Sequence, residues 1–179
     1  MASVKGNGSR GNGAAAAGSP LAAAEELAGF LMAHAVWCVS DGSPLAPLMG
    51  YVKGGERIVA RFGAAQVKDA VEQAQAWMER NPENAERAVF IHDAYVTLEG
   101  RRLDALVATI REYVLPPMGL QVVLPYRPAA AGGFAVYRPK FQAFAGIADL
   151  AALGEAFFRG VNQHEQGARI WNESLDQSL

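Results

Sequence analysis

The stretch that decides the fold of this chain is LAPLMGYVKGGERIVARF, residues 45–62. Its two halves are strand-like and flank the four residues KGGE at 53–56. Two consecutive glycines supply the positive φ angles that a tight hairpin turn needs. After the turn, Ile58, Ala60 and Phe62 alternate with residues on the opposite side of the strand, which is expected to be partly solvated. The stretch therefore predicts an antiparallel hairpin with one face in the core.

An apolar helix is expected before this hairpin. Ser19 and Pro20 make a good helix start, because a serine hydroxyl caps the first turn and proline favours the first helical position. The turn-forming residues 41–44 end the helix. Apolar residues cover so much of its circumference that more than one neighbour is expected to pack against it.

A second helix is expected after the hairpin, over residues 64–80. Its apolar residues recur at helical spacing and form one stripe: Val67, Ala70, Val71, Ala74, Trp77 and Met78. Charged and amide side chains occupy the opposite side, and Asn81 with Pro82 ends the helix. This segment is the clearest amphipathic helix of the chain.

The remaining elements are expected to be strands followed by one helix. Residues 85–98 should form a central strand, because its first half is apolar on both faces. Residues 103–114 fit a helix by periodicity, whereas their Val, Thr, Ile and Tyr content and the short turn before them favour a strand. Strand is preferred, and helix stays open. A last hairpin is expected from 121–126 and 134–141, and then an apolar helix over 147–162.

Together these elements predict an α+β fold. It has a mostly antiparallel sheet of five to six strands and three helices, in the order α-β-β-α-β-β-β-β-α. In element order, residues 20–163 are similar to the roadblock/longin and profilin-like group of sandwiches, with one strand more than the roadblock order, and to the type III secretion chaperones. The resemblance implies a sandwich of helices on a sheet, and it implies no activity, because a fold of this kind does not fix a function.

Composition narrows the class of protein. The domain is expected to span 19–163, between a flexible Gly/Asn/Ala-rich tail (1–18) and a polar C-terminal tail (164–179) in which Trp171 either docks elsewhere or packs back on the domain. A net charge of -2 leaves no electrostatic footprint for nucleic acid. The single cysteine, Cys38, excludes an internal disulfide and favours a reducing, cytoplasmic compartment. No uninterrupted apolar run approaches the roughly 20 residues of a membrane span, so no membrane is expected.

No cofactor loop or metal cluster is recognisable, and neither a cofactor nor a metal is expected. His34 and Cys38 lie four residues apart and so share a helix face. His92 and Asp93 are adjacent in a strand, point to opposite faces and cannot form a dyad with each other. If the first helix packs on the His92 face, then His92 meets His34 or Cys38, and these four residues become the candidates for an enzyme or ligand site. The alternative is a hydrogen-bonded core histidine beside a small buried thiol.

Asp93 is the most interesting carboxylate of this set. If its face of the sheet is covered, the group needs a partner or a raised pKa. Arg57 or Arg61 of the neighbouring hairpin is the expected partner. The alternative is a surface-facing charge or a structural ion pair.

An unusual repeat flanks the glycines at 132–133. Tyr126-Arg127-Pro128 is followed by Tyr137-Arg138-Pro139, and a hairpin would bring the two arms together. Tyrosine and arginine are common at protein interfaces. The alternative is an edge strand protected by proline and arginine. Tyr126, Arg127, Tyr137 and Arg138 are therefore the candidate partner-binding residues.

Two functions remain. The first is a non-enzymatic interaction or scaffold domain that binds itself as a homodimer or binds another protein, favoured by the lack of a chemical constellation and by two broadly apolar helices. The second is a small-ligand sensor or an enzyme with a pocket between the first helix and the sheet, around His34, Cys38 and His92, where Arg61 orients an anion. The second function requires these residues to converge on one cavity, whereas the first does not.

Overall fold

The predicted hairpin forms and lies at one edge of the sheet. β1 (Leu48–Lys53) and β2 (Glu56–Arg61) pair antiparallel. Between them, Gly54 and Gly55 have φ angles of 58° and 79°. These are left-handed conformations, which two-residue hairpin turns require and glycine adopts freely.

A computed structural model describes residues 20–62, 66–143 and 150–179. The expected tail 1–18 and the Ser19 cap lie outside these ranges. Besides the hairpin, the elements in chain order are α1 (Pro20–Val39), α2 (Val67–Arg80), β3 (Arg87–Leu98), β4 (Arg101–Glu112), β5 (Met118–Arg127), the 3₁₀ turn η1 (Ala129–Ala131), β6 (Ala135–Val136), β7 (Lys140–Ala143), α3 (Leu150–Asn162) and α4 (Glu165–Glu173).

One antiparallel sheet runs through the molecule. Its strand order is β2-β1-β3-β4-β5-β6, and β7 also pairs with β5. β3 lies in the middle, as predicted. The segment left open at 103–114 belongs to a strand, β4, which pairs with β3 along its whole length and with β5 on its other side. Hydrogen bonding along both edges outweighs the helical periodicity of its side chains.

The α+β class is confirmed, with two differences in detail. The expected strand 134–141 is divided into β6 and β7, and Pro139, which has no N–H to donate, lies between them. The expected polar tail instead contains a fourth helix, α4. Its Trp171 is only 2% exposed and packs edge-to-face near Phe157 and Phe158, so the tryptophan packs back on the domain. One buried tryptophan in a nine-residue helix is too short an apolar pattern to reveal the helix.

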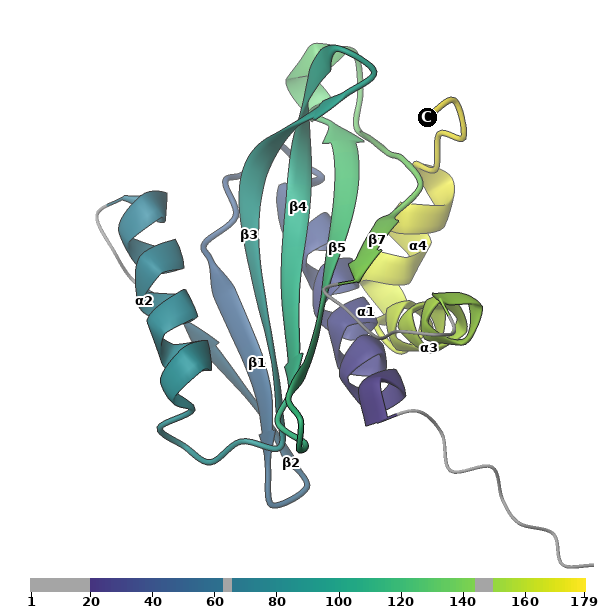
Figure 1. Ribbon diagram of the computed structural model, residues 1–179. Coiled ribbons are helices and arrows are strands. Elements are labelled where there is room, and N and C mark those ends of the chain that lie inside the picture. Colours follow the sequence, from purple (N-terminus) through teal and green to yellow (C-terminus); the bar gives the residue numbers. More distant parts are fainter. Residues whose placement is uncertain (1–19, 63–65, 144–149) are drawn as a thin grey trace, which may run out of the picture.

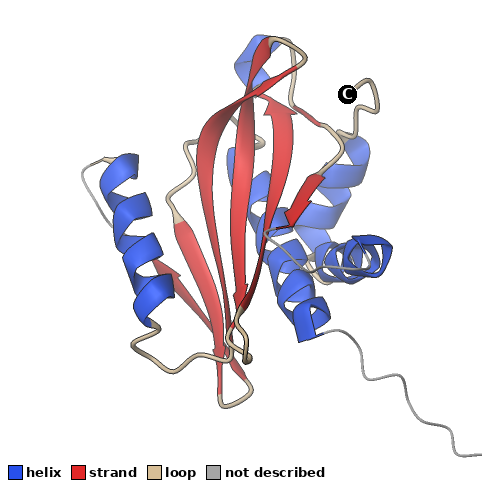
Figure 2. Ribbon diagram, in the orientation of Figure 1, coloured by secondary structure: helices blue, strands red, loops and turns tan. Residues whose placement is uncertain are grey.

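The helices lie on both faces of the sheet (Figures 1 and 2). α1 packs on one face, where it shares a core with Val89 and Ile91 of β3, and α3 and α4 pack against α1. α2 lies on the opposite face, in a smaller cluster with Ala88 and Phe90 of the same strand. Below, these are called the α1 face and the α2 face.

α1 and α3 approach each other at backbone contact. A Cβ added at Gly29 of α1 would lie 1.8 Å from the carbonyl oxygen of Phe157, and one added at Gly160 of α3 would lie 1.9 Å from that of Glu26. Glycine is therefore required at both positions. The two apolar helices cover each other, so much of the apolar surface that favoured a partner is buried within the chain, although Trp37 and Phe158 stay 43% and 41% exposed.

α1 is a core helix. Its segment Leu21–Val39 is long and apolar enough to cross a membrane by length and composition alone, but most of it is buried between the sheet, α3 and α4. Inside this core, Glu25 is fully buried, and neither of its carboxyl oxygens has a hydrogen-bond partner among the residues that the structure describes. Burial raises the pKa of Glu25 to about 8. The core thus holds a carboxyl group that is neutral over much of the physiological range.

Candidate functional site

His92 and Asp93 point to opposite faces of the sheet, as their spacing predicts. His92 stacks on Phe90 of the α2 face, with ring centroids 5.3 Å apart. Asp93 points to the α1 face and accepts a hydrogen bond from Tyr126. Because α1 packs on the Asp93 side, His92 meets neither His34 nor Cys38. The proposed grouping of these three residues is therefore wrong, because the first helix covers the face of the sheet opposite to His92.

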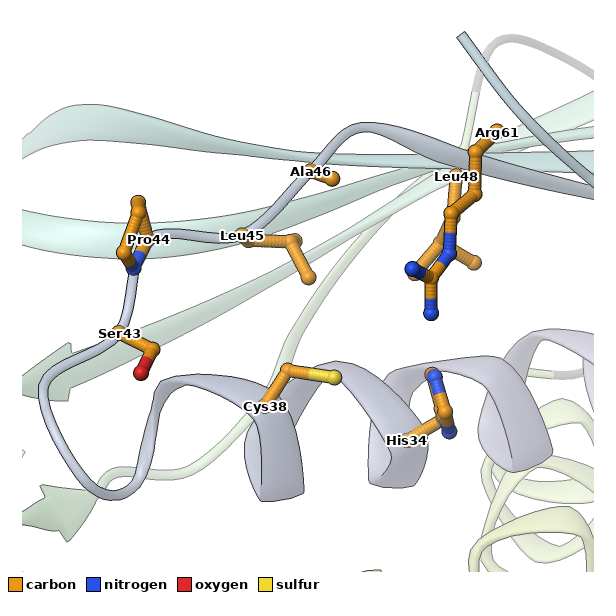
Figure 3. A pocket seen from close by; sticks show the side chains of 8 residues that line it. All are labelled: His34, Cys38, Ser43, Pro44, Leu45, Ala46, Leu48 and Arg61. Atoms are coloured by element: carbon orange, nitrogen blue, oxygen red, sulfur yellow. The ribbon is translucent and has the colours of Figure 1, made fainter. Parts of the chain in front are cut away.

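His34 and Cys38 do share a pocket, and Arg61 joins them. The pocket has a volume of about 210 Å³ and lies between the C-terminal half of α1, the loop after it and the hairpin. Figure 3 shows His34 and Cys38 rising from α1 toward the guanidinium of Arg61, which reaches over from β2. Apolar Leu45 and Leu48 form part of the wall. This pocket lies between the first helix and the sheet, where the second hypothesis expected one.

Electrostatics make the pocket a poor nucleophile site. Burial, together with the nearby His164 ring and the Arg61 guanidinium, lowers the pKa of His34, so its imidazole is neutral. Burial raises the pKa of the Cys38 thiol, although nearby Arg61 acts in the opposite direction. The thiol is therefore protonated at neutral pH, and only a thiolate attacks efficiently. The arrangement favours binding over covalent catalysis.

His164 is the residue of this site that sequence reasoning missed. It caps α4, because its Nδ1 accepts a hydrogen bond from the N–H of Gly167, and its Nε2 lies 3.1 Å from Nδ1 of His34. Trp37, which is 43% exposed, lies against both rings. A histidine at a helix N-cap is not among the usual capping residues, so the sequence carried no signal for this role.

Asp93 has a different partner from the one expected. The Tyr126 hydroxyl donates to its Oδ2 at 2.9 Å, whereas Arg61 lies in the pocket and Arg57 stacks over Phe30. Burial raises the pKa of Asp93, and the hydrogen bond from Tyr126 partly offsets this rise. Its other oxygen is buried without a partner among the described residues. The hydrogen bond therefore links β3 to β5 on the α1 face of the sheet.

The two Tyr-Arg-Pro arms contact their own C-terminus. Tyr126 and Tyr137 are buried, so only the arginines of this candidate set remain near the surface. Arg127 donates to the carbonyl of Gly133 and lies 3.7 Å from Asp176, and Arg138 donates to the Gln177 side chain at 2.9 Å. The backbone of the same tail pairs with β6 at Val136. Within this chain, the arms therefore hold residues 174–177.

A groove on the α2 face is the second hollow of interest. It measures about 320 Å³ and runs between α2 and the neighbouring strands β4 and β5. Its lining is mostly polar: Gln75, Met78, Glu79, Thr109, Arg111 and Gln121. Glu79 and Arg111 lie on opposite rims, and neither forms an ion pair with a residue that the structure describes. Sequence patterns assigned Glu79 to the solvated side of α2 and did not single out Arg111.

Beyond this groove, part of the α2 face carries an apolar cluster made of strand residues alone. Ala105, Val107 and Val123 are buried there, with Ala94 and Val96 partly buried against them. No described helix contributes to this cluster. α2 therefore covers the β1 side of this face, and no helix of the described ranges covers the β4–β5 side; this second part is called the open half below.

Among the described residues, no group of three or more His, Cys, Asp or Glu side chains has a geometry that would hold a metal ion. Comparison of the chain with protein families, with curated proteins and with solved structures gave no significant match.

Proposed function

We propose that this protein is a non-enzymatic interaction domain that forms a homodimer through its α2 face. The observation that carries the proposal is the open half, where a cluster of strand residues has no described helix over it. In the single chain, α2 lies beside this area. A two-fold axis would place the partner's α2 next to the chain's own, so that both helices lie between the two sheets. Such an isologous contact uses the same surface on both copies.

Charge complementarity supports a second copy as the occupant. Side chains alternate along a strand. The α2-facing positions of β3, β4, β5 and β7 include Arg111 and Lys140, together with Arg101, which pairs with Glu99 of the adjoining turn, and these strand positions hold no carboxylate. α2 itself carries three acidic and two basic residues. A helix with negative charge and a strand face with positive charge on one chain are complementary between two copies, which favours their association and fixes its geometry.

The contact we propose pairs the two rims of the groove between chains. Glu79 of each α2 meets Arg111 of the other chain's β4, and both charges lack an ion pair with described residues in the single chain. The interface is polar around a small apolar centre, which is the usual composition of non-obligate contacts. The proposed contact surface is therefore the α2 face and not the Tyr-Arg-Pro arms, which hold the chain's own residues 174–177.

Light scattering coupled to size exclusion tests the proposal on the full chain. We expect a mass of twice the 19.0 kDa chain. Glu79→Arg and Arg111→Glu each place like charges opposite each other and are expected to shift the protein to monomer. Glu155→Arg is the matched control: it makes the same change of charge at an exposed position of α3, far in the fold from α2, and should leave the dimer intact. A monomeric wild-type chain would overturn the proposal.

A further inference from the structure

The hydrogen bonds around His34 fix where the protons of two histidines lie. The N–H of Gly167 donates to Nδ1 of His164 at 3.0 Å, so this nitrogen carries no proton. His164 is therefore neutral in this arrangement, with its proton on Nε2. That N–H faces Nδ1 of His34 at 3.1 Å and donates to it. The proton of neutral His34 must then lie on its own Nε2.

The series of hydrogen bonds from Gly167 through His164 to His34 leaves one donor directed into the pocket. With Nδ1 of His34 used by His164, the other ring nitrogen is left to face the cavity, and Figure 3 shows a ring nitrogen of His34 directed toward the Arg61 guanidinium. Both groups are donors, and two donors cannot satisfy each other. Arg61 also has no ion pair with a described residue. The pocket thus presents an excess of N–H donors and one full positive charge.

The described lining holds no carboxylate that could accept hydrogen bonds from these donors. The nearest acid in sequence, Asp41, is not part of this lining, and its Oδ1 accepts the N–H of Ser43 at 2.9 Å. The rest of the wall is mainly apolar, with Pro44, Leu45 and Leu48. A volume of about 210 Å³ lies below the range of drug-sized sites. The fitting ligand is small, anionic at one end and apolar at the other.

We propose that this pocket binds a short aliphatic carboxylate, with the Arg61 guanidinium and the Nε2–H of His34 donating to its oxygens and Leu45 and Leu48 contacting its alkyl chain. Arginine is suited to this role because its planar fork matches the two oxygens of a carboxylate. The site is on the α1 side of the hairpin, and it is independent of the proposed dimer on the α2 face.

Titration with butyrate, followed by NMR of the histidine side-chain nitrogens, tests the site on the full chain. We expect both His34 and His164 to carry their proton on Nε2 without ligand, and the Nε2 signal of His34 to shift on saturation. For a ligand of this size, a dissociation constant of the order of 1 mM is expected. A proton on Nδ1 of His34, or no saturable shift, would overturn the proposal.

Three comparisons distinguish the carboxylate from other ligands. Butyramide, which has the same shape and no charge, should not bind. Inorganic phosphate should bind more weakly than butyrate, because it gains nothing from the apolar wall; the opposite order would overturn the carboxylate assignment.

Arg61→Gln should weaken butyrate binding by about tenfold or more, because a charge-assisted pair is lost. Arg57→Gln, on the same strand but outside the pocket lining, is the matched control and should bind as the wild type does. Equal loss in both variants would also overturn the proposal.

Discussion

On the α1 face, three helices close over the sheet, and α1 and α3 touch at their backbones through glycine. On the α2 face, one amphipathic helix covers the β1 side and leaves the β4–β5 side to a small cluster of strand residues. The core of the first face also holds the buried carboxyl group of Glu25, which has no hydrogen-bond partner within the described ranges. Buried apolar side chains are therefore concentrated on the α1 face, and the α2 face is the one where a cluster of strand residues has no described helix over it.

The largest expected effect contrasts two tryptophans, one from each face. Trp171→Ala should destabilise the fold by about 3–5 kcal/mol, because the ring is 2% exposed and packs from α4 against Phe157 and Phe158 of α3 in the main core. Trp77→Ala on α2 should cost clearly less, because Trp77 is only partly buried, against Tyr51. Denaturant unfolding of both variants measures the two costs. Equal costs would remove the contrast between the faces.

A pair of glycines on α3 sharpens the account of the closed face. Gly160→Ala should destabilise by about 3 kcal/mol, since the new methyl group would overlap the backbone of α1. Gly154→Ala, six residues earlier on the same helix, has nothing within 4 Å of its new Cβ and should stabilise by about 0.5–1 kcal/mol through helix propensity. Thermal or denaturant unfolding checks the opposite signs. If both changes have the same sign, the close crossing of α1 and α3 is wrong.

Glu25 makes the stability of the closed face depend on pH. Its pKa is raised from 4.5 to about 8 on folding, so the folded state holds the proton more tightly than the unfolded state does. The carboxyl group therefore destabilises the fold progressively as pH rises from about 4.5 to about 8. By pH 7 the loss is about 3 kcal/mol.

Glu25→Gln removes this titration. We expect the variant to gain stability relative to the wild type as pH rises through that window, and to be closest to it near pH 4.5. Urea unfolding at several pH values gives the two curves. Parallel curves would show that Glu25 is not buried as a neutral acid.

The smallest expected effect concerns the arginines of the Tyr-Arg-Pro arms. Arg127→Ala combined with Arg138→Ala should cost no more than about 1 kcal/mol, because exposed ion pairs and hydrogen bonds contribute little. The change should instead speed hydrogen exchange at Asp176, whose N–H donates to Val136. Unchanged exchange at Asp176 would mean that the arms do not hold the tail. Strongly impaired folding would make the arginines structural.

The sequence predicted the fold class because local signals and burial agreed. The glycines at 54–55 are enough to predict the hairpin, and the apolar stripe is enough to predict α2; both elements were confirmed. Segment 103–114 needed the structure, since a run of Val, Thr and Ile is compatible with two periodicities until its hydrogen-bonding neighbours are known. α4 was missed because its apolar face is little more than Trp171.

The candidate site was predicted in part. The spacing of His34 and Cys38 placed both on one helix face, and they share a pocket with Arg61. His92 lies outside the pocket because α1 packs on the opposite face of the sheet. The alternation of side chains along a strand separates the two faces but does not tell which of them a helix will cover. His164 was unpredictable, because it reaches His34 across 130 residues through the crossing of α4 over α1.

The most direct test of the α2-face dimer mixes two variants that should not dimerise alone. In Glu79→Arg each copy carries two positive rims, and in Arg111→Glu each carries two negative rims. Light scattering of an equimolar mixture should recover the dimer mass, twice 19.0 kDa, because both contacts of the mixed pair are then attractive. A mixture that stays monomeric while the wild type is dimeric would contradict the account, since the two charges would then not meet across the interface.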